Sequence, residues 1–485
     1  MFRRGPAGII AALWLAEITG SFETAMIFAA LNRLIADFND PVLVGWLITT
    51  FLLIGAGSAA IAGRLGDLYG RRRVMLILLA VGVVGSLISA FSTSFAVLLF
   101  GRALQGITGA ILPLALGLVR ENMTRERVPM AIGLMISGAS AGTAAGLVIG
   151  GMIVDQFSWH GVFFASAGFA ATAFVAILAG LPPSPKAHRD GPLDWLGGVL
   201  FVPGILGLLL VISSGPKWGW LDLRTIGIAI ASIAVLVVWV RHSLASREPL
   251  FDVRLFRNRQ ILVANLATAL IATGALQITL VFSVLLQAPR WTMIGLGATA
   301  TVAGLAKLPS NIGSLFAGPL SGWLTERHGG RIVMLIGGGL TTLGWLLAMA
   351  FNDSILVVTI ILCVISFGTT MLFAVGPTIL VDAVAPDRTS EAAGMMTVVR
   401  QAFMGIGAQI IAILLATETV AVSGSTTRYP TPAAFMLAMS VIIGLTSVAT
   451  LLAFALPKRA RPKTQWLEAT AAAFGWRRRG GSTGR

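Results

Sequence analysis

The feature that most limits how this chain can fold is a series of apolar runs, each about 20 residues long. A helix that rises about 1.5 Å per residue needs about this length to cross a hydrocarbon layer roughly 30 Å thick. Backbone polar groups find no water in that layer, so helices are the expected spanning form. With 56% hydrophobic residues and a mean hydropathy of +0.88, the chain cannot form an ordinary globular surface. The sequence therefore predicts an integral membrane protein.

The apolar runs divide the 485-residue chain into helices separated by short polar connections. We expect an all-α membrane protein with 14 transmembrane helices, near residues 8–36, 42–62, 74–92, 95–118, 129–154, 161–181, 195–214, 224–242, 260–286, 295–322, 332–351, 354–381, 393–416 and 433–456.

Positive charge is distributed very unevenly among the connections. Of the 35 Lys and Arg residues, about 27 fall in the two termini and the even-numbered connections. By the positive-inside rule, this bias places both termini in the cytoplasm. The net charge of +15 is then a consequence of topology and does not indicate a nucleic-acid partner. The basic tail "WRRRGGSTGR" is interpreted as a disordered segment that touches anionic lipid of the bilayer.

Two similar basic motifs lie about half a chain apart. The first motif is "GRLGDLYGRRR" at 63–73, and the second motif is "GWLTERHGGR" at 322–331. They indicate two repeats, which we assign to six-helix bundles in residues 1–182 and 259–457. Residues 183–258 then form an inserted helix pair with cytoplasmic linkers, and 458–485 a basic cytoplasmic tail. Repeated bundles are typical of secondary transporters, whose substrate site lies near the membrane midplane.

Several motifs carry a resemblance to a known family. The first motif resembles the loop signature of the major facilitator superfamily, and "LLFGRALQGITGA" (98–110) resembles its fourth-helix signature. "GTAAGLVIGG" (142–151) is similar to the fifth-helix signature of its antiporters. "FETAMIFAALNRLIADF" (22–38) is similar to the first-helix signature of the fourteen-helix drug:proton antiporter branch. The resemblance implies an alternating-access carrier.

Charged residues in the two basic motifs are candidates for gating. Positive-inside anchoring explains the arginines but leaves the acids unexplained. A charge cluster at the mouth of a carrier can instead hold two helices in one state and release them in another. The candidates are Gly63, Asp67, Arg71 and Arg72 in the first motif, with Glu326, Arg327 and Arg331 in the second.

Two acids, Glu17 and Glu23, lie in the first apolar run. A carboxylate in hydrocarbon costs about 2.5 to 3.5 kcal/mol, so it normally faces a cavity or a partner. Buried carboxyl groups can hold a proton near neutral pH, which proton coupling requires. Glu23 matches the position where the antiporter branch carries an acid. Glu17 lies about 9 Å away along the axis, on a different face. The alternative for both is a structural carboxyl bonded to a neighbouring helix.

In the run at 95–118, Arg102 and Gln105 share one helix face. A guanidinium stays charged, so a buried Arg needs a partner. Because family members place this Arg near the first helix, the resemblance makes Glu23 the candidate partner. The alternative is an Arg that snorkels to the interface.

The remaining candidates concern packing and substrate. Gly142, Gly146, Gly150 and Gly151 form a small-residue track that allows close helix packing and serves gating. The apolar substrate contacts that we expect are Phe22, Met26 and Phe28, which flank Glu23. The polar substrate contacts that we expect are Gln105, Lys307, Arg400 and Gln401. Lys307, Arg400 and Gln401 can equally bond to backbone carbonyls.

These features predict a proton-coupled exporter that acts as a monomer in a bacterial plasma or inner membrane. The family resemblance implies lipophilic, cationic small molecules as its substrates. We expect no metal or other cofactor, because no metal-ligand spacing and no phosphate-binding loop occur. Leu147 stands where the antiporter signature carries Pro, which keeps a lipid or amphiphile carrier, or an importer, open as an alternative. A membrane-embedded lipid-modifying enzyme would need clustered acids or histidines at one membrane face, and the sequence offers none.

Overall fold

The computed structural model describes residues 5–38, 41–184, 194–246, 249, 252–298, 300–420 and 429–456. The first bundle contains α1 (Pro6–Phe38), α2 (Pro41–Tyr69), α3 (Arg71–Ala90), α4 (Phe95–Gly106), η1 (Ile107–Ala110), α5 (Ile111–Asn122), α6 (Val128–Gln156) and α7 (His160–Gly180). The helices α8 (Trp195–Trp218) and α9 (Leu223–Ala245) and the short η2 (Val253–Arg257) follow. The basic tail and residues 185–193 of the first linker lie outside the described residues.

The second bundle contains α10 (Arg259–Thr273), η3 (Ala275–Gln277), α11 (Ile278–Gln287), η4 (Arg290–Thr292), α12 (Ala300–His328), α13 (Gly330–Ala350), α14 (Ile355–Ala383), η5 (Pro386–Arg388), α15 (Thr389–Ala416), α16 (Pro432–Leu451) and η6 (Leu452–Ala455). A small antiparallel pair, β1 (Thr419–Val420) and β2 (Tyr429–Pro430), connects α15 to α16.

The helix pattern agrees closely with the apolar runs. Two pairs, α4–α5 and α10–α11, each continue through a short 3-10 turn, so the described residues form fourteen helical rods. Thirteen of them are long and apolar enough to cross a membrane. The other rod, α12, has 29 residues but includes Lys307, Asn311 and two internal prolines, which make it more polar. The predicted all-α architecture is confirmed.

The two basic motifs are helical through most of their length. We expected α2 to end near residue 62, but it continues to Tyr69, and α3 begins at Arg71. Gly70 alone makes the turn, with φ 97° in the left-handed region that favours glycine. The second motif behaves in the same way, since Gly329 (φ 84°) separates α12 from α13. The charged residues therefore project from helix ends and not from a loop.

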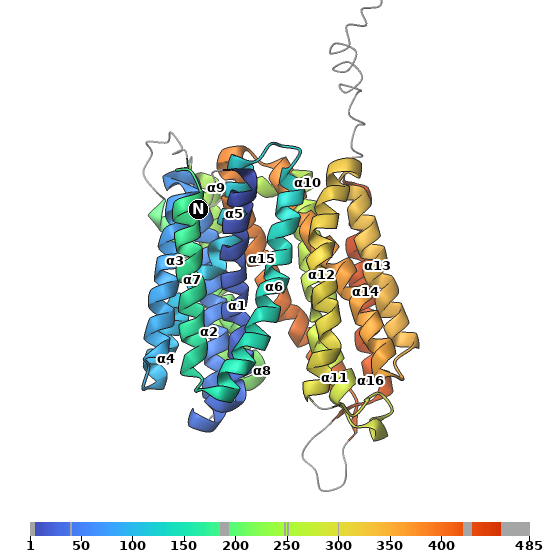
Figure 1. The fold of residues 1–485 in the computed structure, drawn as a ribbon. Helices are drawn as coiled ribbons and strands as arrows, with labels where there is room; N and C mark the ends of the chain where they lie inside the picture. Colours follow the sequence, from blue (N-terminus) through green and yellow to red (C-terminus); the bar gives the residue numbers. More distant parts are fainter. Residues whose placement is uncertain are drawn as a thin grey trace, which may run out of the picture.

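The two bundles lie side by side, with α6 and α15 along their boundary (Figure 1). On one side α6 packs against α12, where a Cβ on Gly133 would overlap the backbone of Gly318. On the other side α15 packs against α2, where a Cβ on Gly63 would overlap the backbone of Ser390. Glycines at these points allow the backbones of the two bundles to touch.

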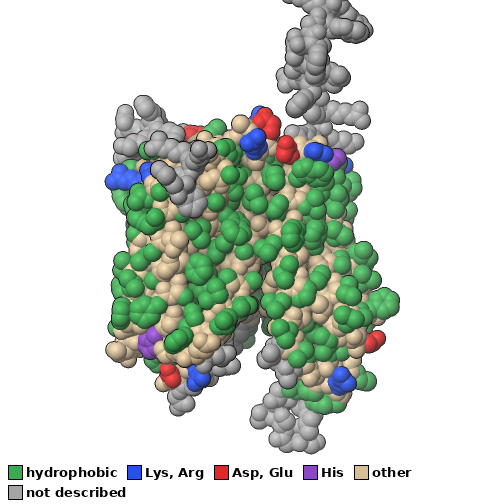
Figure 2. Space-filling model, viewed as in Figure 1, with side chains coloured by type: hydrophobic (Ala, Val, Ile, Leu, Met, Phe, Trp, Pro, Cys, Tyr) green, Lys and Arg blue, Asp and Glu red, His purple; other side chains and the backbone are tan. Residues whose placement is uncertain are grey.

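We call the end of the molecule that carries the Gly70 and Gly329 turns the basic end. Both described termini lie there. Arg72 bonds to carbonyls near the end of α7, whose Gly180 lies beside Gly8, and Leu456 lines a cavity with Gly329. At the opposite end, Figure 2 shows the surface hollowed between the two bundles. The bundles thus touch at the basic end and separate at the other.

The helices α8 and α9 pack mainly against each other and lie across the boundary between the bundles. Phe201 of α8 contacts Trp239 of α9 with ring centroids 4.9 Å apart. The same apolar cluster includes Ala56 of α2 and Ala402 of α15. The α8–α9 pair therefore contacts both bundles and does not pack on the first bundle alone.

Candidate functional site

A cluster of buried charges joins the two bundles at the basic end. Asp67 of α2 accepts hydrogen bonds from the backbone N–H groups of Ser390 (3.3 Å) and Glu391 (2.8 Å), at the start of α15. A carboxylate at a helix N-terminus satisfies free N–H groups and complements the helix dipole. Arg71 holds the same carboxylate through its Nε, at 2.7 Å. Asp67 thus links the second helix of one bundle to α15 of the other.

Arg71 and Arg64 extend this link. Arg71 donates to the Pro386 carbonyl of the second bundle (2.5 Å) and pairs with Glu121 of its own bundle (2.9 Å). Arg64 pairs with Glu391 across the boundary at 3.2 Å, and both side chains are almost fully buried. We name Arg64, Asp67, Arg71 and Glu391 the inter-bundle cluster.

Further contacts surround the inter-bundle cluster. Arg120, at the end of α5, donates to the Val384 carbonyl and to Thr389 Oγ1, both at 2.9 Å. Asp252, in the linker after α9, donates its N–H to Glu391 (2.9 Å) and pairs with Arg388 (2.7 Å). Sequence reasoning did not select Arg120, Asp252 or Glu391. In the sequence, Glu391 could have been selected only because it is an acid placed just before an apolar run.

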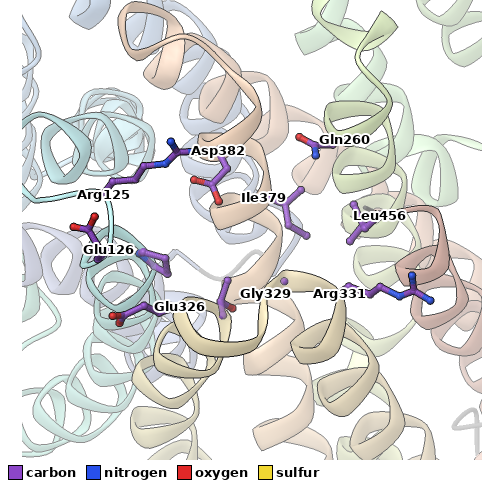
Figure 3. A pocket seen from close by; sticks show the side chains of 12 residues that line it. Arg125, Glu126, Gln260, Glu326, Gly329, Arg331, Ile379, Asp382 and Leu456 are labelled. Atoms are coloured by element: carbon purple, nitrogen blue, oxygen red, sulfur yellow. The ribbon is translucent and has the colours of Figure 1, made fainter. Parts of the chain in front are cut away.

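Arg72, Arg327 and Arg331 of the basic motifs make contacts within their own bundle. Arg72 donates to the Leu178 carbonyl of α7 at 2.7 Å. Arg327 lies over the Trp323 ring at 4.2 Å, and Arg331 over the Phe454 ring at 4.9 Å. Glu326 and Arg331 line a cavity of about 390 Å³ at the basic end, shared with residues after α5 (Figure 3).

Glu23 is fully buried inside the first bundle. Its Oε2 accepts from Thr108 Oγ1 at 2.5 Å, and its Oε1 accepts from Ser166 at 3.0 Å and Ser86 at 3.5 Å. No part of its side chain is exposed. Among the described residues, Glu23 lines neither the cavity of about 390 Å³ at the basic end nor the cavities of about 110 Å³ and 330 Å³ between the bundles. The carboxyl group that we expected in an open cavity is enclosed by hydroxyl groups.

Arg102 and Gln105 belong to the same enclosed network. Arg102 is fully buried and lies over the Phe51 ring at 4.3 Å, so it does not snorkel. It donates to the backbone carbonyl of Glu23 (3.2 Å) and to Gln105 Oε1 (2.9 Å). We expected the Glu23 carboxylate to be the partner of Arg102. That detail is wrong, because Arg102 contacts the backbone carbonyl of Glu23. Gln105 is fully buried and its Nε2 donates to Ser86 Oγ at 2.7 Å. Its role as a substrate contact stays a prediction.

Glu17 and Arg400 instead lie at the boundary of the bundles. A small central cavity of about 110 Å³ is lined by Glu17 and Thr108 of the first bundle and by Arg400 and Gln401 of the second. Glu17 is 8% exposed. Arg400 lies over the Phe373 ring at 4.9 Å, and its Nε has no hydrogen-bond partner among the described residues. Opposite charges from the two bundles therefore face one cavity.

The apolar residues around Glu23 do not form a substrate pocket. Phe22 and Met26 have no exposed surface, and the Phe22 ring packs on Phe169 with centroids 4.6 Å apart. Phe28 is half exposed, away from the described cavities. Helix packing encloses Phe22 and Met26 in this structure, and their role as substrate contacts stays a prediction. Lys307 donates to the Thr279 carbonyl (3.3 Å) and Ser283 (3.1 Å) of α11.

The glycine track of α6 packs on α1, with one exception. A Cβ on Gly142 would meet Ser21 Cβ at 2.8 Å, and one on Gly146 would meet Ala25 Cβ at 2.8 Å. Gly150 lies slightly farther away, with Ala29 Cβ at 3.2 Å. Gly151 has nothing within 4 Å, so its place in the track is wrong. It lies one residue past the packing face of the helix.

Two helical bundles around a central cavity that holds charges from both define a membrane carrier. The family model of the Major Facilitator Superfamily matches residues 13–310 and 278–481, and the chain belongs to that superfamily. It is a transporter and not an enzyme, as the sequence predicted, and its multi-pass structure and bacterial relatives place it in a cell membrane.

Similar proteins include drug exporters. The chain is 30% identical over 399 residues to "Multidrug resistance protein Stp" of Mycobacterium tuberculosis, covering 79% of this chain and 72% of the relative. It is 28% identical over 369 residues to "Tetracenomycin C resistance and export protein" of Streptomyces glaucescens, covering 76% and 67%. The solved structure of the proton:xylose symporter XylE has a TM-score of 0.65 at 13% identity, covering 96% of this chain and 98% of that one, and shares the fold.

Proposed function

We propose that this transporter exports lipophilic small molecules, lipophilic cations among them, in exchange for protons. It would act as a monomer in a bacterial plasma or inner membrane and belong to the fourteen-helix drug:proton antiporter branch. The names of its relatives as multidrug and tetracenomycin exporters support the direction of transport and the substrate class. The fourteen helical rods support the branch.

The observation that carries the proposal is the central cavity, where Glu17 and Arg400 lie on opposite bundles. Arg400 attracts an ionised Glu17 and draws the bundles together around the cavity. Protonation of Glu17 removes that attraction. A lipophilic cation that enters the cavity competes with the proton for the same carboxylate. For an uncharged substrate, each proton moving down 100 mV supplies about 2.3 kcal/mol, close to a 50-fold concentration ratio. Exchange of one proton for one monovalent cation moves no net charge, so the pH gradient drives it.

Thr108 gives Glu23 a connection to the same cavity. Thr108 lines the cavity, and its hydroxyl lies within hydrogen-bond distance of both Glu23 Oε2 (2.5 Å) and the Gln105 carbonyl (2.7 Å). One hydroxyl proton cannot serve two acceptors at once. If Glu23 is protonated, it donates to Thr108, and Thr108 donates to Gln105. We infer that the network stores a proton on Glu23 and exchanges it through the Thr108 hydroxyl.

The inter-bundle cluster would act as the gate at the basic end. Four buried charged groups hold α15 against α2 there. A network of this kind has few intermediate arrangements, because a partly separated buried ion pair leaves charges unsatisfied. It therefore suits a two-state element that opens when the bundles rock.

Ethidium transport into inside-out proteoliposomes tests the proposal. With an acidic interior, we expect the wild type to accumulate the dye, and a protonophore to abolish accumulation. Glu17→Gln keeps the shape of a protonated side chain but removes the charge for which proton and cation compete, so we expect at least a tenfold loss of proton-driven uptake. Accumulation that is insensitive to the protonophore, or uptake that needs the opposite pH gradient, would contradict proton-coupled export.

A further inference from the structure

A second cavity, of about 330 Å³, lies beside the central one and is walled by three parts of the chain. The first bundle contributes Leu52 of α2, and the second contributes Gln277 of η3 and Gln401 and Gln409 of α15. The third wall is α8, through Leu209 and Ile212. This volume falls at the lower end of the range of small-molecule pockets, about 300 to 1,000 Å³. We name it the α8 pocket.

The lining of the α8 pocket indicates the chemistry of its ligand. Leucine, isoleucine and methionine side chains line it together with three glutamines, and none of the described lining residues is ionisable. Gln401 and Gln409 make no hydrogen bond within the described residues, so their amides are available to a ligand. Gln277 is oriented by bonds from its Nε2 to the carbonyls of Ala272 (2.9 Å) and Met404 (3.0 Å). The pocket suits an uncharged lipophilic body with one or two hydrogen-bonding groups.

The α8 pocket adjoins the central cavity. Leu52 and Gln401 line both cavities. A ligand in the α8 pocket can therefore place a polar or cationic end toward Glu17 and Arg400 while its apolar body stays between α2, α8 and α15. In this arrangement the α8 pocket holds the lipophilic part of the ligand, and the central cavity with Glu17 and Arg400 interacts with its charge.

The position of α8 depends on close packing at the pocket wall. Leu209 and Ile212 are 7% and 8% exposed, whereas Val199 on the same helix is 65% exposed. A Cβ on Gly405 of α15 would meet Ile212 Cγ2 at 2.9 Å, so the glycine allows α15 to approach α8 at this wall. The face of α8 that carries Leu209 and Ile212 is therefore built into the boundary of the two bundles.

We propose that α8 forms part of the ligand site, and that the α8 pocket binds the uncharged lipophilic body of the transported molecule. The inserted helix pair is then a wall of the binding site and not a spacer. This inference rests on the proposed function, because it assigns a place to the substrate of the exporter.

Filling the α8 pocket tests the proposal in cells. We expect Ile212→Trp to lower efflux of the uncharged dye N-phenyl-1-naphthylamine at least tenfold, since the larger side chain occupies the cavity. Val199→Trp adds the same side chain on the exposed face of α8 and should change efflux by less than twofold. The amount of each variant in the membrane is measured beside efflux. Equal efflux by Ile212→Trp and Val199→Trp at equal amounts would overturn the proposal.

Binding is measured separately from transport by cysteine protection. The single native cysteine, Cys363, is replaced by Ser, and Ile212→Cys or Val199→Cys is introduced for alkylation by a maleimide in purified protein in lipid nanodiscs. We expect N-phenyl-1-naphthylamine to slow alkylation at position 212 at least fivefold and to leave position 199 unchanged. Equal rates at position 212 with and without dye would overturn the α8 site. If protection occurs and the wild type exports no dye, the proposed export function fails while the site stands.

Discussion

Two glutamates on α1 lie six residues apart and have very different surroundings. Glu17 lines the central cavity with Arg400, whereas Glu23 is enclosed by Thr108, Ser86 and Ser166. The rarity of acids in apolar runs made both residues predictable as candidates. The sequence could not show which of the two glutamates lines the central cavity. Helical spacing places the two side chains on different faces of α1, but it does not show which face lies toward the other bundle.

Thr108 carries the predicted exchange between Glu23 and the cavity. Thr108→Val keeps the shape of the side chain but removes the hydroxyl that touches Glu23 and Gln105. We expect at least a tenfold loss of proton-driven dye uptake and a pH profile that differs from the wild type. Thr108→Ser retains the hydroxyl and should restore both. A Thr108→Val variant with wild-type uptake and pH profile would show that Glu23 takes no part through this residue.

At the scale of helices, the close packing of α6 on α1 depends on Gly146. A methyl group at Gly146 would meet Ala25 Cβ at 2.8 Å and the Phe22 carbonyl at 2.9 Å, so the helices would have to separate. Overpacking of this kind typically costs about 1 to 3 kcal/mol. We expect Gly146→Ala to lower the thermal unfolding midpoint measurably in detergent. Gly151→Ala meets nothing within 4 Å and is the matched control. Equal midpoints for the two variants would contradict this packing.

The contact between Asp67 and the start of α15 is the second element-scale feature. Asp67→Asn removes the charge that faces the N–H groups of Ser390 and Glu391, an effect of about 1 to 2 kcal/mol. In a Cys363→Ser background, we expect the buried Ser390→Cys side chain to react with a maleimide about 5 to 30 times faster when Asp67 is Asn.

The control for this experiment is Arg72→Gln, because the Arg72 guanidinium bonds to the Ile177 and Leu178 carbonyls of its own bundle. We expect it to leave the labelling rate of Ser390→Cys within twofold. Comparable acceleration by Asp67→Asn and Arg72→Gln would show that general loosening of the basic end, and not the helix-capping contact, controls access.

At the scale of the whole molecule, the bundles are joined at the basic end and hollowed apart at the other (Figure 2). The positive-inside rule predicts that the basic end faces the cytoplasm, and with that orientation the hollow between the bundles would open outward. The fourteen rods were predictable because membrane thickness fixes the length of an apolar helix. Asp67 and Arg71 were predictable as gating residues, but their link to Glu391 was not. Arg64 and Glu391 are separated by 327 residues, and only the assembled bundles bring them together.

Alternating access predicts opposite changes at the two ends. Spin labels at Arg127 and His328 report the basic end, and labels at the exposed Phe157 and Phe351 report the other. We expect Asp67→Asn to lengthen the first distance and shorten the second in pulsed electron paramagnetic resonance. Lengthening of both distances together would indicate loss of bundle contact and not rocking.

The most direct test of proton coupling by the α1 carboxyl groups is proton release from purified, protonated transporter when ethidium is added in weakly buffered solution. We predict release by the wild type, and at least a fivefold loss of release in Glu17→Gln and in Glu23→Gln, with both variants still folded. Release equal to that of the wild type in both variants would contradict the account.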